Sequence, residues 1–224
     1  MKKKITCFIP VRSGSKRIKN KNIVDINGFP LIKYVCKNII RSKLIDKFYI
    51  ASDNLKIYDK IGNLKKKINF FKRSKKNSTG TSTSEDVLLE FLKINKDIDI
   101  LVFVQATNPF INYNNIDQAI TKLINQKYDS VLSVVKSKHF LWENKKITKP
   151  LNYNYKKRMM SQSLKGYYVE NGSFYIFYRE KFMKYKNRLH GKIGTFEMPK
   201  ESIHEIDDKE DLILVKKIIA NTKL

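Results

Sequence analysis

The chain has 224 residues, of which 42% are hydrophobic and 12% aromatic, and this predicts one domain of ordinary size with a substantial core. No apolar run is long enough to cross a bilayer, and Arg12 interrupts the short run near the start, so we expect no membrane span, no signal peptide and a cytoplasmic location. The formal net charge of +25 invites a nucleic-acid interpretation, but the Lys residues are spread over every segment, so we expect a general field that favours anionic substrates and no nucleic-acid partner.

Strands and helices are expected to alternate over the first part of the chain. Apolar runs rich in β-branched residues predict strands, and apolar residues at helical spacing predict helices between them. The expected strands cover residues 5–11, 47–51, 68–72, 98–104 and 130–135, and the expected helices cover residues 30–42, 55–64, 84–95 and 116–125. This order predicts an α/β domain with a mostly parallel sheet between two layers of helices, a three-layer, Rossmann-like arrangement.

The regular pattern breaks down after residue 135. Residues 136–168 are polar, aromatic and basic without a clear period, and we expect residues 136–172 to form an arm inserted into a single domain of residues 1–224. Order returns with expected strands at 173–178 and 192–198 and a final helix at 209–220. Cys7 and Cys36 fall in the first strand and the first helix, where we expect buried free thiols.

Local signals mark several turns and helix ends. Asn27 and Gly28 form a dipeptide typical of a tight turn, and Asn171 and Gly172 repeat it later in the chain. Thr83 or Ser84 is expected to cap the helix that follows.

Ligands of a parallel sheet bind at the carboxyl ends of the strands, so the loops there are the expected site. The loop after the first strand contains three small residues, whose backbone N–H groups can approach a phosphate closely. Arg12, Lys16 and Lys21 in the same loop can neutralise a triphosphate. The alternative is a solvated basic loop, since the segment matches neither the G-x-G-x-x-G pattern nor the Walker pattern.

Two other strand ends carry polar residues. Asp53 follows the second strand, where it either faces the site or caps the helix that begins at Leu55. Gln105 and Thr107 follow the central strand, where an amide and a hydroxyl can fix a polar ligand. The alternative for this segment is a polar turn before Pro109.

An acidic segment stands out near the end of this basic chain. Glu205 and Asp207 flank Ile206, so on an extended segment they share one face. Two carboxylates on one face suit Mg²⁺ when phosphate oxygens and water complete its shell. The alternative, which does not exclude the first, is that Asp207 or Asp208 caps the last helix.

Six segments, in chain order, resemble the acylneuraminate (CMP-sialic acid) cytidylyltransferase family. The first loop, from Pro10 to Asn22, resembles the family signature P-A-R-x-G-S-K-x-I-x-x-K-N, and Asp53 and Arg73 follow at the matching strand ends. The remaining three resemble the boxes Q-x-T-S-P-L/F, E-N-G-x-F/I-Y and D-x-D-x-x-x-D-L, and they begin at residues 105, 170 and 205. The chain departs from the family pattern at Ser74, Gly80 and Asn108, and its match to the family's R-R-Q-D segment is partial.

The resemblance implies a nucleotidyltransferase fold with a small dimerisation arm. It implies transfer of CMP from CTP to the anomeric hydroxyl of a nonulosonic (sialic-acid-like) sugar, an acidic nine-carbon sugar, with release of pyrophosphate. It also implies a homodimer in which the arm reaches the partner's active site.

The same resemblance assigns roles to individual residues. It implies catalytic roles for Lys21, Arg12 and Asp207, with Lys21 holding the phosphates as pyrophosphate leaves. The implied nucleotide contacts are Arg12, Ser15, Lys16, Lys21, Asn22, Arg73 and Ser84. The implied sugar contacts are Gln105, Thr107, Arg158, Gln162 and Asn171. The implied Mg²⁺ ligands are Glu205 and Asp207.

Other functions remain open on the sequence alone. One is a related sugar nucleotidyltransferase that uses Kdo or another nucleotide. A second is a basic nucleic-acid-binding protein without enzyme activity, and a third is an inactive family member, because Gly80 and Asn108 depart from the pattern. The sequence names neither the general base nor the particular nonulosonic acid.

Overall fold

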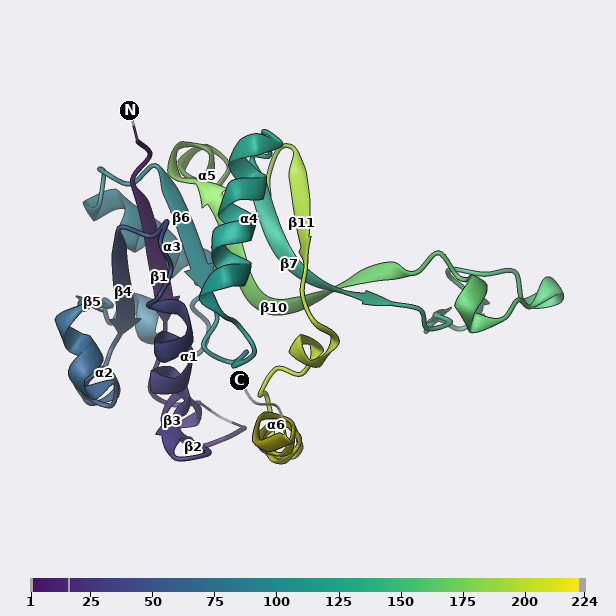
Figure 1. Cartoon of the computed structure of the whole chain (residues 1–224), viewed down its shortest axis with the longest axis horizontal. Coiled ribbons are helices and arrows are strands. Elements are labelled where there is room, and N and C mark those ends of the chain that lie inside the picture. Colours follow the sequence, from purple (N-terminus) through teal and green to yellow (C-terminus); the bar gives the residue numbers. More distant parts are fainter. Residues whose placement is uncertain (1, 16, 222–224) are drawn as a thin grey trace.

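The computed structural model of the chain describes residues 2–15 and 17–221. A seven-stranded sheet runs through its centre, in the order β11-β7-β10-β6-β1-β4-β5 (Figure 1). The strands of this sheet are β1 (Ile5–Pro10), β4 (Lys47–Ser52), β5 (Ile68–Lys72), β6 (Ile100–Val104), β7 (Ser130–Ser137), β10 (Tyr167–Tyr178) and β11 (Ile193–Glu197). The α-helices are α1 (Leu31–Ile39), α2 (Leu55–Asp59), α3 (Ser84–Ile94), α4 (Tyr113–Asn125), α5 (Arg179–Tyr185) and α6 (Lys209–Asn221).

The sheet is mostly parallel, as the alternating pattern predicts. β1 pairs in parallel with β4 and β6, β4 pairs in parallel with β5, and β7 pairs in parallel with β11. Only β10 among these strands is antiparallel to its neighbours, β6 and β7. The central strand β6 is a continuous apolar run, and every one of its residues is buried, as expected for a strand covered on both faces.

Two hydrophobic clusters are formed where the helices pack on the two faces of the sheet. One contains the buried side chains of α1, α4 and α6, and the other contains those of α3 and α5. The helices therefore lie on opposite faces, and the molecule has the three layers that the sequence predicts. Cys7 and Cys36 are free and buried in the first cluster.

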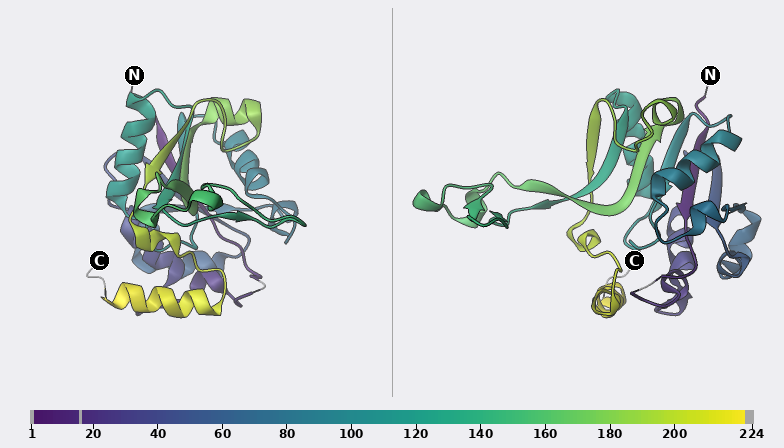
Figure 2. Two further views of the ribbon diagram at one scale, coloured as in Figure 1. Left: turned by 90° about the vertical axis from the view of Figure 1, so that its right-hand side faces the viewer. Right: turned by 180° about the vertical axis from the view of Figure 1, so that it is seen from behind.

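The arm is a long two-stranded ribbon that leaves the body of the molecule (Figures 1 and 2). It is formed by the outer parts of β7 and β10. Their outermost pair is Tyr167 with Ser137, and the pairing continues from there toward the body. Two short strands, β8 (Trp142–Glu143) and β9 (Lys149–Pro150), pair near its far end. No helix in the described part of the chain is both long and apolar enough to cross a membrane.

The structure corrects three local predictions. The helix expected over 55–64 is two pieces, α2 and a 3₁₀ helix at Gly62–Lys66. Helix α5 was not predicted. Asn171 and Gly172 do not form a turn between strands but lie inside β10, where the pairing register with β7 shifts. The turn at Asn27 and Gly28 is confirmed, and it joins the hairpin strands β2 (Asp25–Ile26) and β3 (Phe29–Pro30).

Candidate active site

An open cleft lies where the loops after β1 and β6 meet the segment that leads into α6. Its volume is about 420 Å³. Its lining is rich in cations and hydroxyl groups: Arg12, Ser15, Arg17, Ile18, Lys21, Asn22, Gly80, Thr107 and Asp207. The cleft is therefore at the carboxyl ends of parallel strands, where ligands of such sheets bind.

The first loop is held in shape by its own contacts. The Asn22 side chain donates a hydrogen bond from Nδ2 to the carbonyl oxygen of Arg12 at 3.0 Å. Ile18 is buried in the core, and Asn20 takes a left-handed conformation that starts a short 3₁₀ helix at Lys21–Ile23. Asn22 thus lines the cleft, but its amide supports the loop.

Asp53 fastens the first loop to the end of β4. Its Oδ1 accepts a hydrogen bond from the Ser13 backbone N–H at 2.9 Å, and its other oxygen accepts one from the Ser13 hydroxyl. Burial alone would raise the pKa of Asp53, but these bonds and the charge of Arg73 lower it below the ordinary value. The helix cap that the sequence left open for Asp53 is supplied by Asn54, which accepts from Lys56 N–H at 2.9 Å.

Arg73 is a buried cation beside this anchor, with only 7% of its surface exposed. One guanidinium nitrogen donates to the carbonyl oxygen of Asn77. Its Nε has no hydrogen-bond partner among the described residues. Burial lowers the pKa of Arg73, the Asp53 charge opposes this and the Arg12 charge adds to it. Because a buried donor without a partner is costly, Arg73 is suited to a ligand acceptor.

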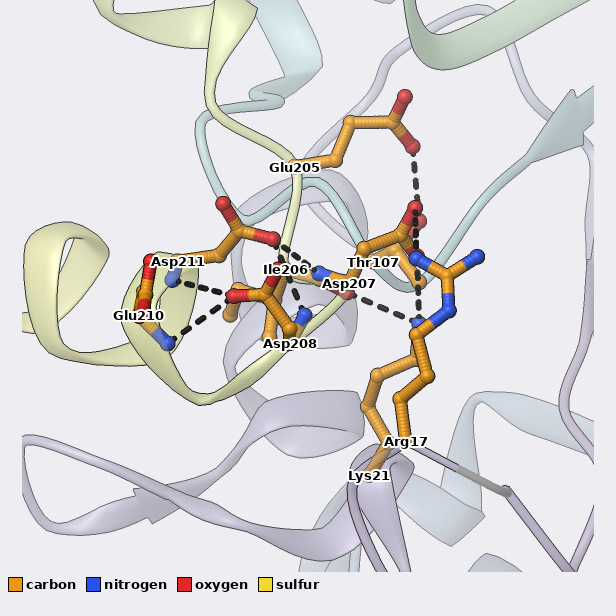
Figure 3. A network of polar contacts seen from close by, with 9 residues as sticks. All are labelled: Arg17, Lys21, Thr107, Glu205, Ile206, Asp207, Asp208, Glu210 and Asp211. Carbon is orange, nitrogen blue, oxygen red and sulfur yellow. Dashed lines mark hydrogen bonds and ion pairs between the residues drawn. The ribbon is translucent and has the colours of Figure 1, made fainter.

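Lys21 and Asp207 join the two ends of the chain across the cleft (Figure 3). Lys21 Nζ donates to the carbonyl oxygen of Ile206 at 2.9 Å and to Asp207 Oδ1 at 2.9 Å. Arg17 Nη1 lies 3.3 Å from Asp207 Oδ2. The hydrogen bond from Lys21 is the main cause that lowers the pKa of Asp207, so this carboxylate stays ionised.

Glu205 lies on the far side of Ile206 in a more buried setting. Thr107 Oγ1 donates to Glu205 Oε2 at 3.3 Å. Burial and the nearby charge of Asp207 raise the pKa of Glu205. The carboxylate fits because Gly172 has no side chain: a Cβ there would lie 2.5 Å from the Glu205 Oε2 atom.

The start of α6 is capped without using the cleft-facing carboxylate. Asp208 Oδ1 accepts from the N–H groups of Glu210 and Asp211, each at 3.0 Å. Asp211 in turn accepts from the N–H groups of Asp207 and Asp208 at 2.9 and 3.0 Å. Asp208 is therefore the cap, and the side chain of Asp207 remains directed to Lys21 and Arg17 (Figure 3).

The donors around Ile206 fit a divalent cation such as Mg²⁺. Glu205 and Asp207 supply carboxylate oxygens, which are the ligands that Mg²⁺ prefers, and a cation between them would relieve the repulsion that raises the pKa of Glu205. Within residues 2–15 and 17–221, no three acidic, His or Cys side chains are grouped so that they could hold a metal. Two protein ligands leave the other positions to water and phosphate, as is usual for Mg²⁺.

The structure brings most of the expected nucleotide residues together. Five of the expected site residues line the cleft itself: Arg12, Ser15, Lys21, Asn22 and Asp207. Thr107, expected to contact the sugar, lines it as well. Arg73 neighbours Asp53 and Arg12, and Ser84 is the half-buried first residue of α3. Lys16 lies outside the described residues.

The expected sugar residues are spread over three places. Gln105 is half-buried at the end of β6, where its N–H donates to the carbonyl oxygen of Ser173 at 3.0 Å. Asn171 is buried, and its amide nitrogen donates to Ser202 Oγ at 2.9 Å and to Met198 Sδ at 3.4 Å. Arg158 and Gln162 lie on the arm, away from the cleft of their own chain (Figure 1).

Sequence reasoning missed three contributors to the site. Arg17 pairs with Asp207, Ser13 anchors the loop to Asp53, and Gly172 makes room for Glu205. Asn108, a departure from the family pattern, is fully buried and donates to the carbonyl oxygens of Asn171 and Ser202, each at 2.8 Å. It therefore supports the strand beside the cleft.

Comparisons with known proteins agree with this geometry. A family model described as Cytidylyltransferase matches residues 6–221. An N-acylneuraminate cytidylyltransferase from Oncorhynchus mykiss is 33% identical over 213 residues, which cover 92% of this chain and 48% of that protein. A pseudaminic acid cytidylyltransferase from Campylobacter jejuni is 28% identical over 220 residues, 94% of each chain. The chain thus spans about half the length of the first relative and nearly all of the second.

Solved structures share the fold. A CMP:2-keto-3-deoxy-manno-octonic acid synthetase complexed with CTP has a TM-score of 0.71 at 17% identity, covering 97% of this chain and 98% of that one. A 4-diphosphocytidyl-2C-methyl-D-erythritol synthase from Anaerococcus prevotii has the same TM-score of 0.71 at 17% identity, covering 98% and 97%.

Proposed function

Because the chain belongs to the cytidylyltransferase family, we propose that it transfers CMP from CTP to the anomeric hydroxyl of a nonulosonic, sialic-acid-like sugar and releases pyrophosphate. The observation that carries the proposal is that a basic loop with small residues meets the Asp207 carboxylate in one cleft, with Glu205 bonded to the lining residue Thr107. The names of the relatives, N-acylneuraminate and pseudaminic acid cytidylyltransferase, support the class of acceptor.

The cleft residues suit attack on a triphosphate. The sugar hydroxyl oxygen forms a bond to the α-phosphorus of CTP, the bond from that phosphorus to the bridging oxygen breaks, and pyrophosphate leaves with the electron pair. The hydroxyl proton passes to a base or to water. Negative charge grows on the leaving group, and Arg12 and Lys21 are placed to stabilise it. Asp53 takes the Ser13 N–H group and so anchors the loop, and the N–H groups of Gly14 and Ser15 are proposed to face the phosphates.

Lys21 begins this reaction paired with Asp207, and that pairing keeps its ammonium group inside the cleft. Glu205 and Asp207 would hold Mg²⁺, which would neutralise triphosphate charge. Arg73 and Ser84 are proposed to face the nucleotide, and Gln105 and Thr107 the sugar.

The arm is proposed to complete the active site of a second copy in a homodimer. Arg158 and Gln162 fall between β9 and β10, in the arm that extends away from the body (Figure 1). The planar fork of Arg158 suits the carboxylate of the sugar, because it can donate to both oxygens. Asn171 is proposed to act from its buried position by supporting the segment beside Glu205.

The test is pyrophosphate release from CTP and Mg²⁺ with a panel of nonulosonic acids, with Kdo as a comparison sugar. We expect release with one panel sugar, loss of release with EDTA and a drop of about a hundredfold or more in Asp207→Ala. Glu210→Gln is the matched control, because it removes an exposed acidic charge from the same segment. Failure of every panel sugar, or an unchanged rate in Asp207→Ala, would contradict the proposal.

A further inference from the structure

Arg188 is enclosed by one carboxylate and two aromatic rings. Its Nε and Nη2 lie 2.6 and 3.0 Å from the two carboxylate oxygens of Glu85, a bidentate ion pair. Its Cζ lies 5.0 Å from the ring centroid of Phe103 and 4.8 Å from that of Tyr175. The side chains of Arg188 and Glu85 are only 20% and 26% exposed. A bidentate pair that is this shielded fixes the guanidinium plane and holds it over the rings.

This cluster adjoins the acceptor end of the proposed site. Tyr175 of β10 pairs with Phe103 of β6, and both side chains lie on the α3 and α5 side of the sheet. Side chains alternate along a strand, so Gln105, two residues after Phe103, continues on the same side. Glu85 is in the first turn of α3, directly after Ser84. The ion pair therefore lies beside residues proposed to contact the sugar and the nucleotide.

Tyr175 connects the cluster to the acidic segment. Its hydroxyl donates to Glu170 Oε1. Burial and this bond raise the pKa of Tyr175, so the phenol remains a neutral donor. Gly172, two residues after Glu170, lies against the Glu205 carboxylate, so this part of β10 adjoins the acidic segment. A continuous set of contacts thus runs from α3 through Arg188, Tyr175 and Glu170.

We propose that Glu85 and Arg188 are positioning residues for the acceptor sugar. Arg188 fixes the ring of Tyr175, and Tyr175 fixes Glu170 so that its second carboxylate oxygen accepts a hydrogen bond from a hydroxyl group of the sugar. The inference rests on the proposed function, because it needs a polyhydroxylated acceptor at this end of the cleft. Arg188 acts through Tyr175 and Glu170, neither of which is a proposed nucleotide contact, so its loss should affect the sugar and spare CTP.

The experiment compares steady-state constants of Arg188→Met and Glu85→Gln with those of the wild type, for the sugar and CTP separately. We expect KM for the sugar to rise about tenfold in Arg188→Met, while KM for CTP changes less than about twofold. In a Tyr175→Phe background, Arg188→Met should add little further, because Arg188 acts through Tyr175. Circular dichroism melting checks that each variant folds, and Glu85→Gln gives a milder disruption if Arg188→Met does not fold.

Arg179→Met is the matched control. Arg179 is also partly buried and donates from Nη2 to the carbonyl oxygen of Leu92 at 3.0 Å, at the other end of α3. A merely structural role for Arg188 would make both variants less stable and leave the sugar KM unchanged in both. If the wild type is active and both variants give that result, the positioning role is overturned and the proposed function is not. A wild type that is inactive with every panel sugar overturns the proposed function, and the positioning role with it.

Discussion

Gly172 shows how one residue without a side chain makes room for a carboxylate of the candidate site. It takes φ 58°, a conformation that glycine adopts without strain. It also lies against Glu205, whose carboxylate occupies the space that a Cβ would fill. The glycine of the E-N-G segment therefore leaves the space that the Glu205 carboxylate occupies.

The first prediction concerns this contact. Gly172→Ala should displace the Glu205 carboxylate and raise the Mg²⁺ concentration needed for half-maximal activity, about tenfold or more. A magnesium titration of pyrophosphate release measures this. Gly28→Ala is the control, because Gly28 has φ 93° but nothing within 4 Å of an added Cβ, so it carries the backbone strain without the clash. An equal magnesium requirement in both variants would contradict the prediction.

Asp53 links the loop after β1 to the end of β4, and its ionisation makes the stability of the fold depend on pH. The pKa of Asp53 is lowered in the fold, since the bonds from Ser13 outweigh its burial. A carboxyl group with a lowered pKa stabilises the fold above its unfolded pKa, and this stability is lost as pH falls through the lowered value.

The second prediction follows from that sign. As pH falls below about 4, the ordinary value for aspartate, the free energy of unfolding should decrease, and Asp53→Asn should remove part of the decrease. Urea unfolding at a series of pH values measures it. Asp59→Asn is the control, because Asp59 is exposed and forms a surface ion pair with Lys65. If the free energy of unfolding falls equally with pH in Asp53→Asn and in the wild type, Asp53 is not a source of the pH dependence.

At the scale of elements, α3 is a helix that begins with a proposed nucleotide contact, Ser84. Thr83 is its N-cap, and a capping box joins Thr83 and Asp86 in both directions. The sequence predicted this start because a hydroxyl residue precedes acidic residues and an apolar helical face. The cap also fixes the first turn, which carries Ser84 and Glu85.

The third prediction tests the cap. Thr83→Ala should lower the free energy of unfolding by about 1 kcal/mol, whereas Thr83→Ser, which keeps the hydroxyl, should lower it much less. Chemical denaturation compares the two. If the serine variant loses as much as the alanine variant, the hydroxyl bond is not the source of the stability.

The long strands and helices were predictable because their apolar residues repeat with a clear period. Helix α5 was missed because it has seven residues and one buried side chain, Phe182. It therefore shows no periodic pattern of apolar residues. The helix expected after Leu55 ends early because Gly62 takes φ 62°, which an α-helix does not allow.

The site was predictable only in part. Residues at strand ends, such as Arg12 and Thr107, were expected because parallel strands bring their carboxyl ends to one edge. The bond between Ser13 and Asp53 depends on β1 lying beside β4, and the place of Glu205 depends on the register shift in β10. The order of residues along the chain does not reveal that Ser13 lies beside Asp53 or that Glu205 lies beside Gly172.

At the scale of the molecule, the arm exposes apolar side chains that the body does not cover. Ile147 and Met160 are 73% and 71% exposed, and Trp142 and Leu151 are exposed nearby. Such a surface favours association with a second copy. This is the physical basis for the proposed homodimer.

The fourth prediction is complementation between inactive variants. If the arm serves the partner's cleft, Arg158→Ala and Asp207→Ala, each inactive alone, should regain activity when refolded together. Random pairing gives half mixed dimers with one intact site each, so about a quarter of wild-type activity is expected. Mixing Asp207→Ala with Lys21→Ala is the control, because each chain then has a defective cleft and no exchange of arms restores an intact site. Light scattering confirms that dimers form.

The contact between Lys21 and Asp207 joins positions 186 residues apart. A ribosome therefore makes the loop that carries Lys21 186 residues before the carboxylate that pairs with it. Until the segment before α6 has left the exit tunnel, the nascent polypeptide has a basic loop with no acidic counterpart. The proposed activity therefore needs synthesis to pass residue 207, and products that terminate before it are expected to be inert.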